Sequence, residues 1–124
     1  MAKARILIVE DEAIVAIDIQ STLKALGYDV PAIAFSGEEA LQKTEELHPD
    51  VVLMDIVLQG QMDGIEAAHQ IQKRFGIPIV YCTAYMNKER LTRAQRTGPC
   101  FFCIKPIDKD EPSFTINRVL EGRE

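Results

Sequence analysis

Apolar and polar positions follow two different periods along this chain. Short runs in which nearly every residue is apolar predict strands buried on both faces, and longer stretches with apolar residues every three or four positions predict helices. The predicted strands cover residues 5–9, 29–35, 51–54, 77–82 and 100–104. The predicted helices cover residues 13–26, 36–47, 63–75 and 87–97, and a last helix runs from near Pro112 through Leu120. This alternation predicts an α/β fold with a parallel sheet and helices on both of its faces.

Local signals mark the ends of several elements. Ser36 with Glu39 three positions later fits a capping box at a helix start. Pro31 indicates that its strand lies near a sheet edge, because proline lacks the N–H that a central strand must donate. In the first helix, the apolar residues follow helical spacing with some scatter; they are Ile14, Ile17, Ile19, Leu23 and Leu26.

Composition narrows the class of protein. A chain of 124 residues, 47% of them hydrophobic, fits one compact domain over residues 1–124 and argues against disorder. The net charge is -5 and the Lys and Arg residues are scattered, which argues against a nucleic-acid or membrane-binding surface. No secretory signal and no membrane-spanning stretch is recognisable, and the cysteines number three. We therefore expect a cytoplasmic protein with reduced thiols.

Polar residues gather where the predicted strands end. Glu10 and Asp11 follow the first strand, Asp55 ends the third, Thr83 ends the fourth and Lys105 ends the fifth. The carboxyl ends of parallel strands share one edge, where ligands bind. Three carboxylates there would repel one another unless a cation intervened, and oxygen ligands of this kind suit Mg²⁺. With an ammonium and a hydroxyl group nearby, the site would suit phosphoryl transfer to Asp55 as a nucleophile.

The order and spacing of these residues resemble the receiver domains of two-component response regulators over nearly the whole chain. The matching segments are Ile-Leu-Ile-Val-Glu-Asp-Glu over 6–12, Val-Val-Leu-Met-Asp over 51–55, Met-Asp-Gly over 62–64, Thr-Ala at 83–84 and Lys-Pro at 105–106. The resemblance implies a flavodoxin-like (βα)5 fold with a five-stranded parallel sheet of order 2-1-3-4-5. It also implies a signalling switch rather than a metabolic enzyme, with no activity beyond Mg²⁺-dependent self-phosphorylation and autodephosphorylation.

The same resemblance implies a role for each site residue. Asp55 would accept the phosphoryl group from a histidine kinase, a phosphotransfer protein or a small phosphodonor. Mg²⁺ would be bound by Glu10, Asp11, Asp55 and the backbone carbonyl of Val57.

Three further residues would sense and transmit the modification. Lys105 would pair with the carboxylate and then with the phosphoryl group, Thr83 would move towards the phosphoryl oxygens, and Phe102 would turn inward as an aromatic switch. Phe102 carries no hydroxyl group, and a static place in the core is an equally good interpretation of it. An effector, an output domain or a second copy of the chain would bind the surface formed by the last two helices and the strand between them.

Three other interpretations compete with this one. A Mg²⁺-dependent phosphohydrolase could share the carboxylates and the lysine, but the short loop after Asp55 offers neither a general acid nor a substrate cap. A dinucleotide-binding oxidoreductase would need a glycine-rich turn after the first strand, where this chain has Glu10, Asp11 and Glu12. A receiver-like scaffold that is never phosphorylated would need none of the site residues.

Overall fold

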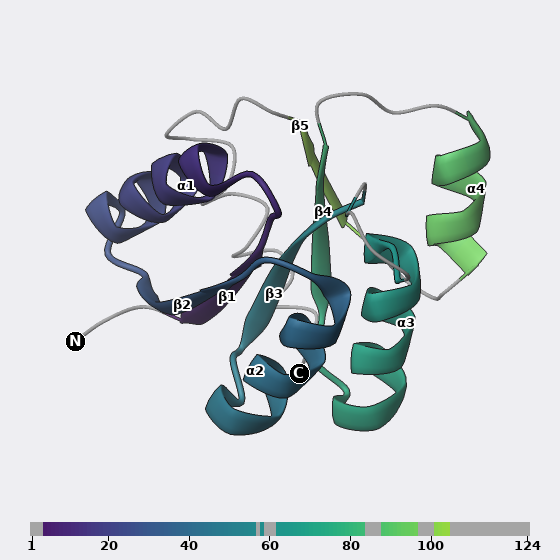
Figure 1. The fold of residues 1–124 in the computed structure, drawn as a ribbon, viewed down its shortest axis with the longest axis horizontal. Coiled ribbons are helices and arrows are strands. Elements are labelled where there is room, and N and C mark those ends of the chain that lie inside the picture. Colours follow the sequence, from purple (N-terminus) through teal and green to yellow (C-terminus); the bar gives the residue numbers. More distant parts are fainter. Residues whose placement is uncertain (1–3, 57, 59–61, 84–87, 97–100, 105–124) are drawn as a thin grey trace.

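A computed structural model describes residues 4–56, 58, 62–83, 88–96 and 101–104. The strands are β1 Arg5–Val9, β2 Asp29–Ala34, β3 Val51–Asp55, β4 Ile79–Thr83 and β5 Phe101–Ile104. The helices within these ranges are α1 Ala13–Ala25, α2 Gly37–Leu47, α3 Gly64–Phe75 and α4 Lys88–Arg96. All strand pairs are parallel, and the sheet has the order β2-β1-β3-β4-β5 (Figure 1). This is the flavodoxin-like sheet that was expected. The predicted last helix lies outside the described residues.

The sheet is covered by helices on both faces, and each face has its own hydrophobic core. Val52 and Met54 of β3 join a cluster that includes side chains of α2, α3 and α4, whereas Val51 and Leu53 join a cluster with α1. Successive side chains of a strand point to opposite faces, so a strand covered on both sides must be apolar at every position. This explains the continuous apolar runs of the sequence.

Proline shapes the edge strand as predicted. Pro31 lies in β2, at the edge of the sheet, and is exposed. The register between β1 and β2 shifts where Arg5 pairs with Asp29 and Leu7 pairs with Ala32. The irregularity includes Pro31, which cannot donate to a ladder.

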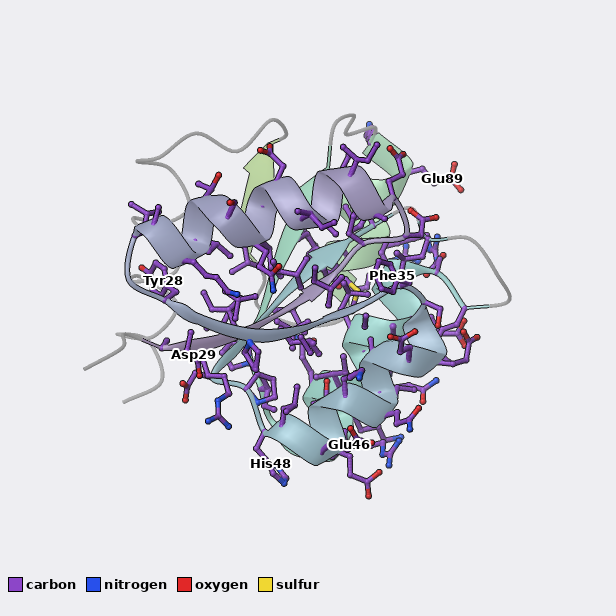
Figure 2. The ribbon with its side chains drawn as sticks, turned by 60° about the vertical axis from the view of Figure 1, so that its left-hand side comes forward. Tyr28, Asp29, Phe35, Glu46, His48 and Glu89 are labelled. Carbon is purple, nitrogen blue, oxygen red and sulfur yellow. The ribbon has the colours of Figure 1, made fainter. Side chains whose placement is uncertain are left out.

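Polar caps fix the starts of α2 and α3. The Ser36 side chain accepts a hydrogen bond from the Glu39 amide at 3.1 Å, and the Asp63 side chain accepts one from the Glu66 amide at 2.9 Å. Both caps satisfy amides that a helix leaves without an internal partner. His48 (labelled in Figure 2) is the C-terminal cap of α2 and has a left-handed φ of 46°.

The structure differs from the sequence prediction by one residue at the end of β2, which is Ala34, and by two residues at the start of β4. We predicted a strand over residues 77–82, but β4 begins at Ile79. Pro78 has no N–H to donate, and its carbonyl oxygen accepts a hydrogen bond from Val52 at 3.1 Å. The first residue of β4 that pairs regularly with β3 is therefore Ile79.

The apolar residues of α1 do not all face the core. The buried stripe of the helix consists of Ala16, Ile19 and Leu23. Ile14 and Ile17 are 86% and 58% exposed, because they lie on the opposite side of the helix. The scatter in the helical spacing thus reflects two isoleucines outside the core.

No helix within the described ranges combines the length and the apolar composition that a bilayer crossing requires.

Candidate functional site

The site lies where the strand order reverses. In the sheet, β1 has β2 on one side and β3 on the other, and Val9 of β1 pairs with Met54 of β3. The next residues along these neighbouring strands are Glu10 and Asp55. The Glu10 amide donates to the carbonyl oxygen of Ala34 at 3.0 Å, which holds the end of β1 beside β2. Acidic residues separated by 45 positions in the sequence are therefore brought to one edge of the sheet.

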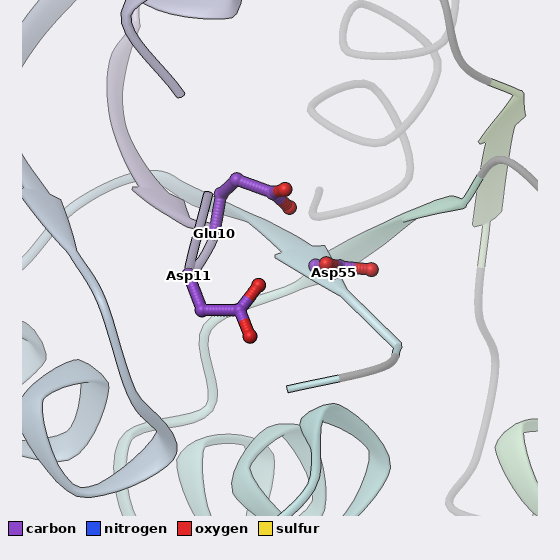
Figure 3. Close-up of side chains that lie close together, drawn as sticks. All are labelled: Glu10, Asp11 and Asp55. Carbon is purple, nitrogen blue, oxygen red and sulfur yellow. The ribbon is translucent and has the colours of Figure 1, made fainter. Parts of the chain in front are cut away.

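Three carboxylates form a compact acidic cluster, which consists of Glu10, Asp11 and Asp55. One carboxylate oxygen from each residue lies within 4.8 Å of those of the other two. Figure 3 shows the side chains of Glu10 and Asp11 reaching from the end of β1 towards Asp55. Glu10 is 1% exposed and Asp55 is 7% exposed, whereas Asp11 is partly exposed. One side of the cluster is thus enclosed by protein and Asp11 gives access from solvent.

The chemistry of the acidic cluster suits a small, hard cation. Negative charges at this separation repel one another, and burial strengthens the repulsion because it removes screening water. Mg²⁺ binds carboxylate oxygens and retains several of its waters, so a cluster with one accessible side matches its preferences. The residues present therefore fit the ion that the sequence predicted.

Of the other predicted site residues, the structure describes the strand positions of two. Thr83 is the last residue of β4, the strand next to β3, and it pairs with Ile104 of β5. Phe102 lies in β5 opposite Tyr81. Val57 and Lys105 lie outside the described residues. The structure therefore brings together the three carboxylates and sets Thr83 at the same edge of the sheet.

A glycine packs directly behind the nucleophile candidate. A Cβ atom at Gly64 would overlap the carbonyl oxygen of Asp55, and the Gly64 amide donates to the carbonyl oxygen of Ile56 at 3.1 Å. The start of α3 thus rests on the end of β3. In the sequence, residues 63–64 indicated a helix start and belonged to a segment that resembles receiver domains, but nothing indicated their contact with Asp55. The available signal was a glycine in a helical first turn, where other residues have higher helix propensity.

An ion pair joins α3 to α4 at the same end of the molecule. Arg93 donates through Nη2 to Oδ2 of Asp63 at 2.8 Å. Partial burial raises the pKa of Asp63, but the hydrogen bond from Glu66 and the guanidinium of Arg93 act in the opposite direction. The net result is a pKa of Asp63 below its ordinary value. No feature of the sequence pointed to this pair, because its members are 30 residues apart.

Comparison with known proteins identifies the family. The family model of the response regulator receiver domain matches residues 6–115. The chain therefore belongs to the response regulator receiver family, and it is a signalling protein of two-component systems.

Individual relatives agree with this assignment. The Thermotoga maritima chemotaxis protein CheY is 33% identical over 116 residues, covering 93% of this chain and 96% of that protein. The transcriptional regulatory protein PdtaR of Mycobacterium tuberculosis is 36% identical over 103 residues, covering 83% of this chain and 50% of that protein. The chain thus spans about half the length of this second relative.

A solved structure shows the same fold. The signal receiver domain of a modulated diguanylate cyclase from Desulfovibrio desulfuricans G20 superposes with a TM-score of 0.91 at 33% identity. The match covers 97% of this chain and 95% of that domain. The architecture deduced from the sheet order is therefore that of a receiver domain.

Proposed function

We propose that this chain is a phosphorylation-activated switch that accepts a phosphoryl group on Asp55 in a Mg²⁺-dependent reaction. The observation that carries the proposal is the acidic cluster, in which three carboxylates from the ends of two adjacent strands lie within 4.8 Å of one another. Membership of the receiver family supplies the reaction class. The proposed donor is a histidine kinase, a phosphotransfer protein or a small phosphodonor.

Asp55 is the proposed nucleophile because it ends a buried strand and its backbone is held firmly. It is 7% exposed, and its carbonyl is backed by Gly64. A carboxylate oxygen of Asp55 attacks the phosphorus of the donor and forms a new P–O bond. The bond between phosphorus and the leaving group breaks, and the leaving group keeps the electron pair. From a phosphohistidine the leaving imidazole takes up a proton and departs neutral, whereas acetyl phosphate releases acetate as the anion.

Glu10, Asp11 and the backbone carbonyl of Val57 complete the proposed metal-binding set with Asp55. The bound Mg²⁺ supplies positive charge against the phosphoryl oxygens. The Lys105 ammonium adds a second positive charge, and the Thr83 hydroxyl is a hydrogen-bond donor for the phosphoryl group. Catalysis then consists of positioning and charge neutralisation.

Thr83 and Phe102 are the proposed route from the modified site to the partner surface. Thr83 ends β4 and Phe102 lies in the neighbouring strand β5, so the two are connected through the β4–β5 ladder. The proposed surface comprises α4, β5 and the predicted last helix. It would bind an effector, an output domain or a second copy of the chain.

We also propose that residues 1–124 form a single receiver domain, which the family match over residues 6–115 supports. The proposed location is the cytoplasm, where the phosphohistidine of a histidine kinase would be the donor.

Intact mass after incubation with acetyl phosphate and Mg²⁺ tests the proposal. The expected result is a single phosphoryl adduct on the wild type that is absent in Asp55→Asn and absent when EDTA replaces Mg²⁺. Asp18→Asn is the matched control, because Asp18 is exposed on α1 and outside the acidic cluster. An adduct that persists in Asp55→Asn, or its absence with both acetyl phosphate and a cognate kinase, would overturn the assignment.

A further inference from the structure

The side chains of α4 that the structure describes are mostly polar and exposed. Among its side chains that the structure describes, Ala94 is the buried one, with 0% exposure in the cluster that also contains Ile65 and Tyr81. The methyl group of an alanine buries little apolar surface. Lys88, Glu89 and Arg96 are exposed. Among the described side chains of α4, Arg93 joins this helix to the start of α3 through a polar contact with Asp63.

The carboxylate of Asp63 is already held in position for such a contact. Its Oδ1 atom accepts the capping hydrogen bond from Glu66 at 2.9 Å, and its Oδ2 atom accepts from Arg93 at 2.8 Å. The cap already fixes the side chain of Asp63, so less conformational entropy is lost when Arg93 binds. Figure 1 shows α4 beside the N-terminal end of α3.

The same end of α3 touches the strand that carries the site. Asp63 precedes Gly64, which lies against the carbonyl of Asp55 and donates its amide to Ile56. Close backbone contact leaves no space for either segment to shift alone. A displacement at the end of β3 is therefore passed to Asp63 and, through the ion pair, to Arg93 on α4.

We propose that Asp63 and Arg93 form a latch that holds α4 against the start of α3 and couples the position of α4 to the end of β3. The latch is a route separate from the one proposed through Thr83 and Phe102, and it involves neither residue. Its existence depends only on the described contacts. Its response to a phosphoryl group on Asp55 rests on the proposed function.

Hydrogen exchange of the α4 amides in the unmodified protein tests the latch first. Arg93→Gln removes the charge, and Asp63→Ser removes the carboxylate while retaining a good N-cap residue. Each variant is expected to exchange α4 amides roughly 1.5- to 5-fold faster than wild type, the range for an exposed ion pair. Their combination is expected to exchange no faster than the faster single variant, because the two residues act as one pair.

Arg96→Gln is the matched control, since it removes the same charge from an exposed position one turn further along α4. It is expected to leave the exchange rates unchanged. Equal rates for Arg93→Gln and Arg96→Gln, or additive effects in the double variant, would overturn the latch.

A second measurement tests the coupling after treatment with acetyl phosphate and Mg²⁺. In wild type that carries the phosphoryl adduct, α4 exchange is expected to change, and the change is expected to shrink at least about twofold in Arg93→Gln. An undiminished change in Arg93→Gln would overturn the coupling. If intact mass shows no adduct, the proposed function fails, and the rates in the unmodified protein still decide the latch.

Discussion

Gly64 lies against the carbonyl oxygen of Asp55, so closely that no other residue fits at this position without movement of the backbone. The contact joins the first turn of α3 to the last residue of β3. The acidic cluster is built on that strand end, and its geometry therefore depends on a residue that contributes no functional group. This dependence makes Gly64 the most informative position for a test of the architecture.

Replacing Gly64 by alanine is expected to lower the free energy of unfolding by about 1–3 kcal/mol, the usual cost of forcing extra volume into a packed site. Urea unfolding measures the loss. Gly76→Asn is the control, because Gly76 has a φ of 66° and open space around it, and asparagine tolerates that conformation. Equal losses in both variants would contradict the steric explanation.

Removing one charge from the acidic cluster is expected to stabilise the protein when no divalent cation is present. Asp11→Asn relieves the repulsion from Glu10 and Asp55, which corresponds to about 1–3 kcal/mol at this separation. It should also reduce the stabilisation that Mg²⁺ gives the wild type, because one charged ligand is lost. Thermal unfolding in EDTA and in Mg²⁺ measures both effects. Asp18→Asn should change neither, and a less stable Asp11→Asn protein in EDTA would refute the repulsion.

The N-terminal cap of α2 predicts a second loss of stability. Ser36→Ala leaves the Glu39 amide without its side-chain acceptor and is expected to cost about 1 kcal/mol in urea unfolding. Ser21→Ala provides the comparison, since Ser21 is exposed within α1. A cost for Ser36→Ala no larger than that of Ser21→Ala would show that the cap does not stabilise the helix.

The lowered pKa of Asp63 predicts a pH dependence of stability. The folded pKa lies below the unfolded value of about 3.9, so the unfolded chain binds more protons in the acid range. The stabilisation is therefore complete above that value and disappears as the pH falls through the folded pKa. The stability difference between wild type and Asp63→Asn should be about 0.5–1 kcal/mol at pH 6 and smaller at pH 3.

Urea unfolding at the two pH values measures this change. Asparagine keeps the capping ability, so the difference isolates the charge. Arg93→Gln should reduce the difference, because the guanidinium is one cause of the lowered pKa. A difference that grows towards pH 3 would contradict the sign of the shift.

The sequence by itself determined the sheet and the acidic cluster. β1 is apolar from Ile6 to Val9 and β3 from Val51 to Met54, because helices cover both faces, and that pattern is visible without coordinates. Glu10, Asp11 and Asp55 could be predicted to meet because parallel strands end at one edge. Ser36 and Asp63 were recognisable at helix starts because capping depends on local chain geometry.

Tertiary structure alone decided the contacts between surfaces of separate elements. The exposure of Ile14 and Ile17 depends on how α1 lies on the sheet, and helical spacing leaves that rotation open. The overlap of Gly64 with the Asp55 carbonyl and the pairing of Arg93 with Asp63 depend on where helices pack. Local sequence fixes the periodicity of helices and strands and the residues at which they begin and end. Distances between these elements are set by the packing of the whole core.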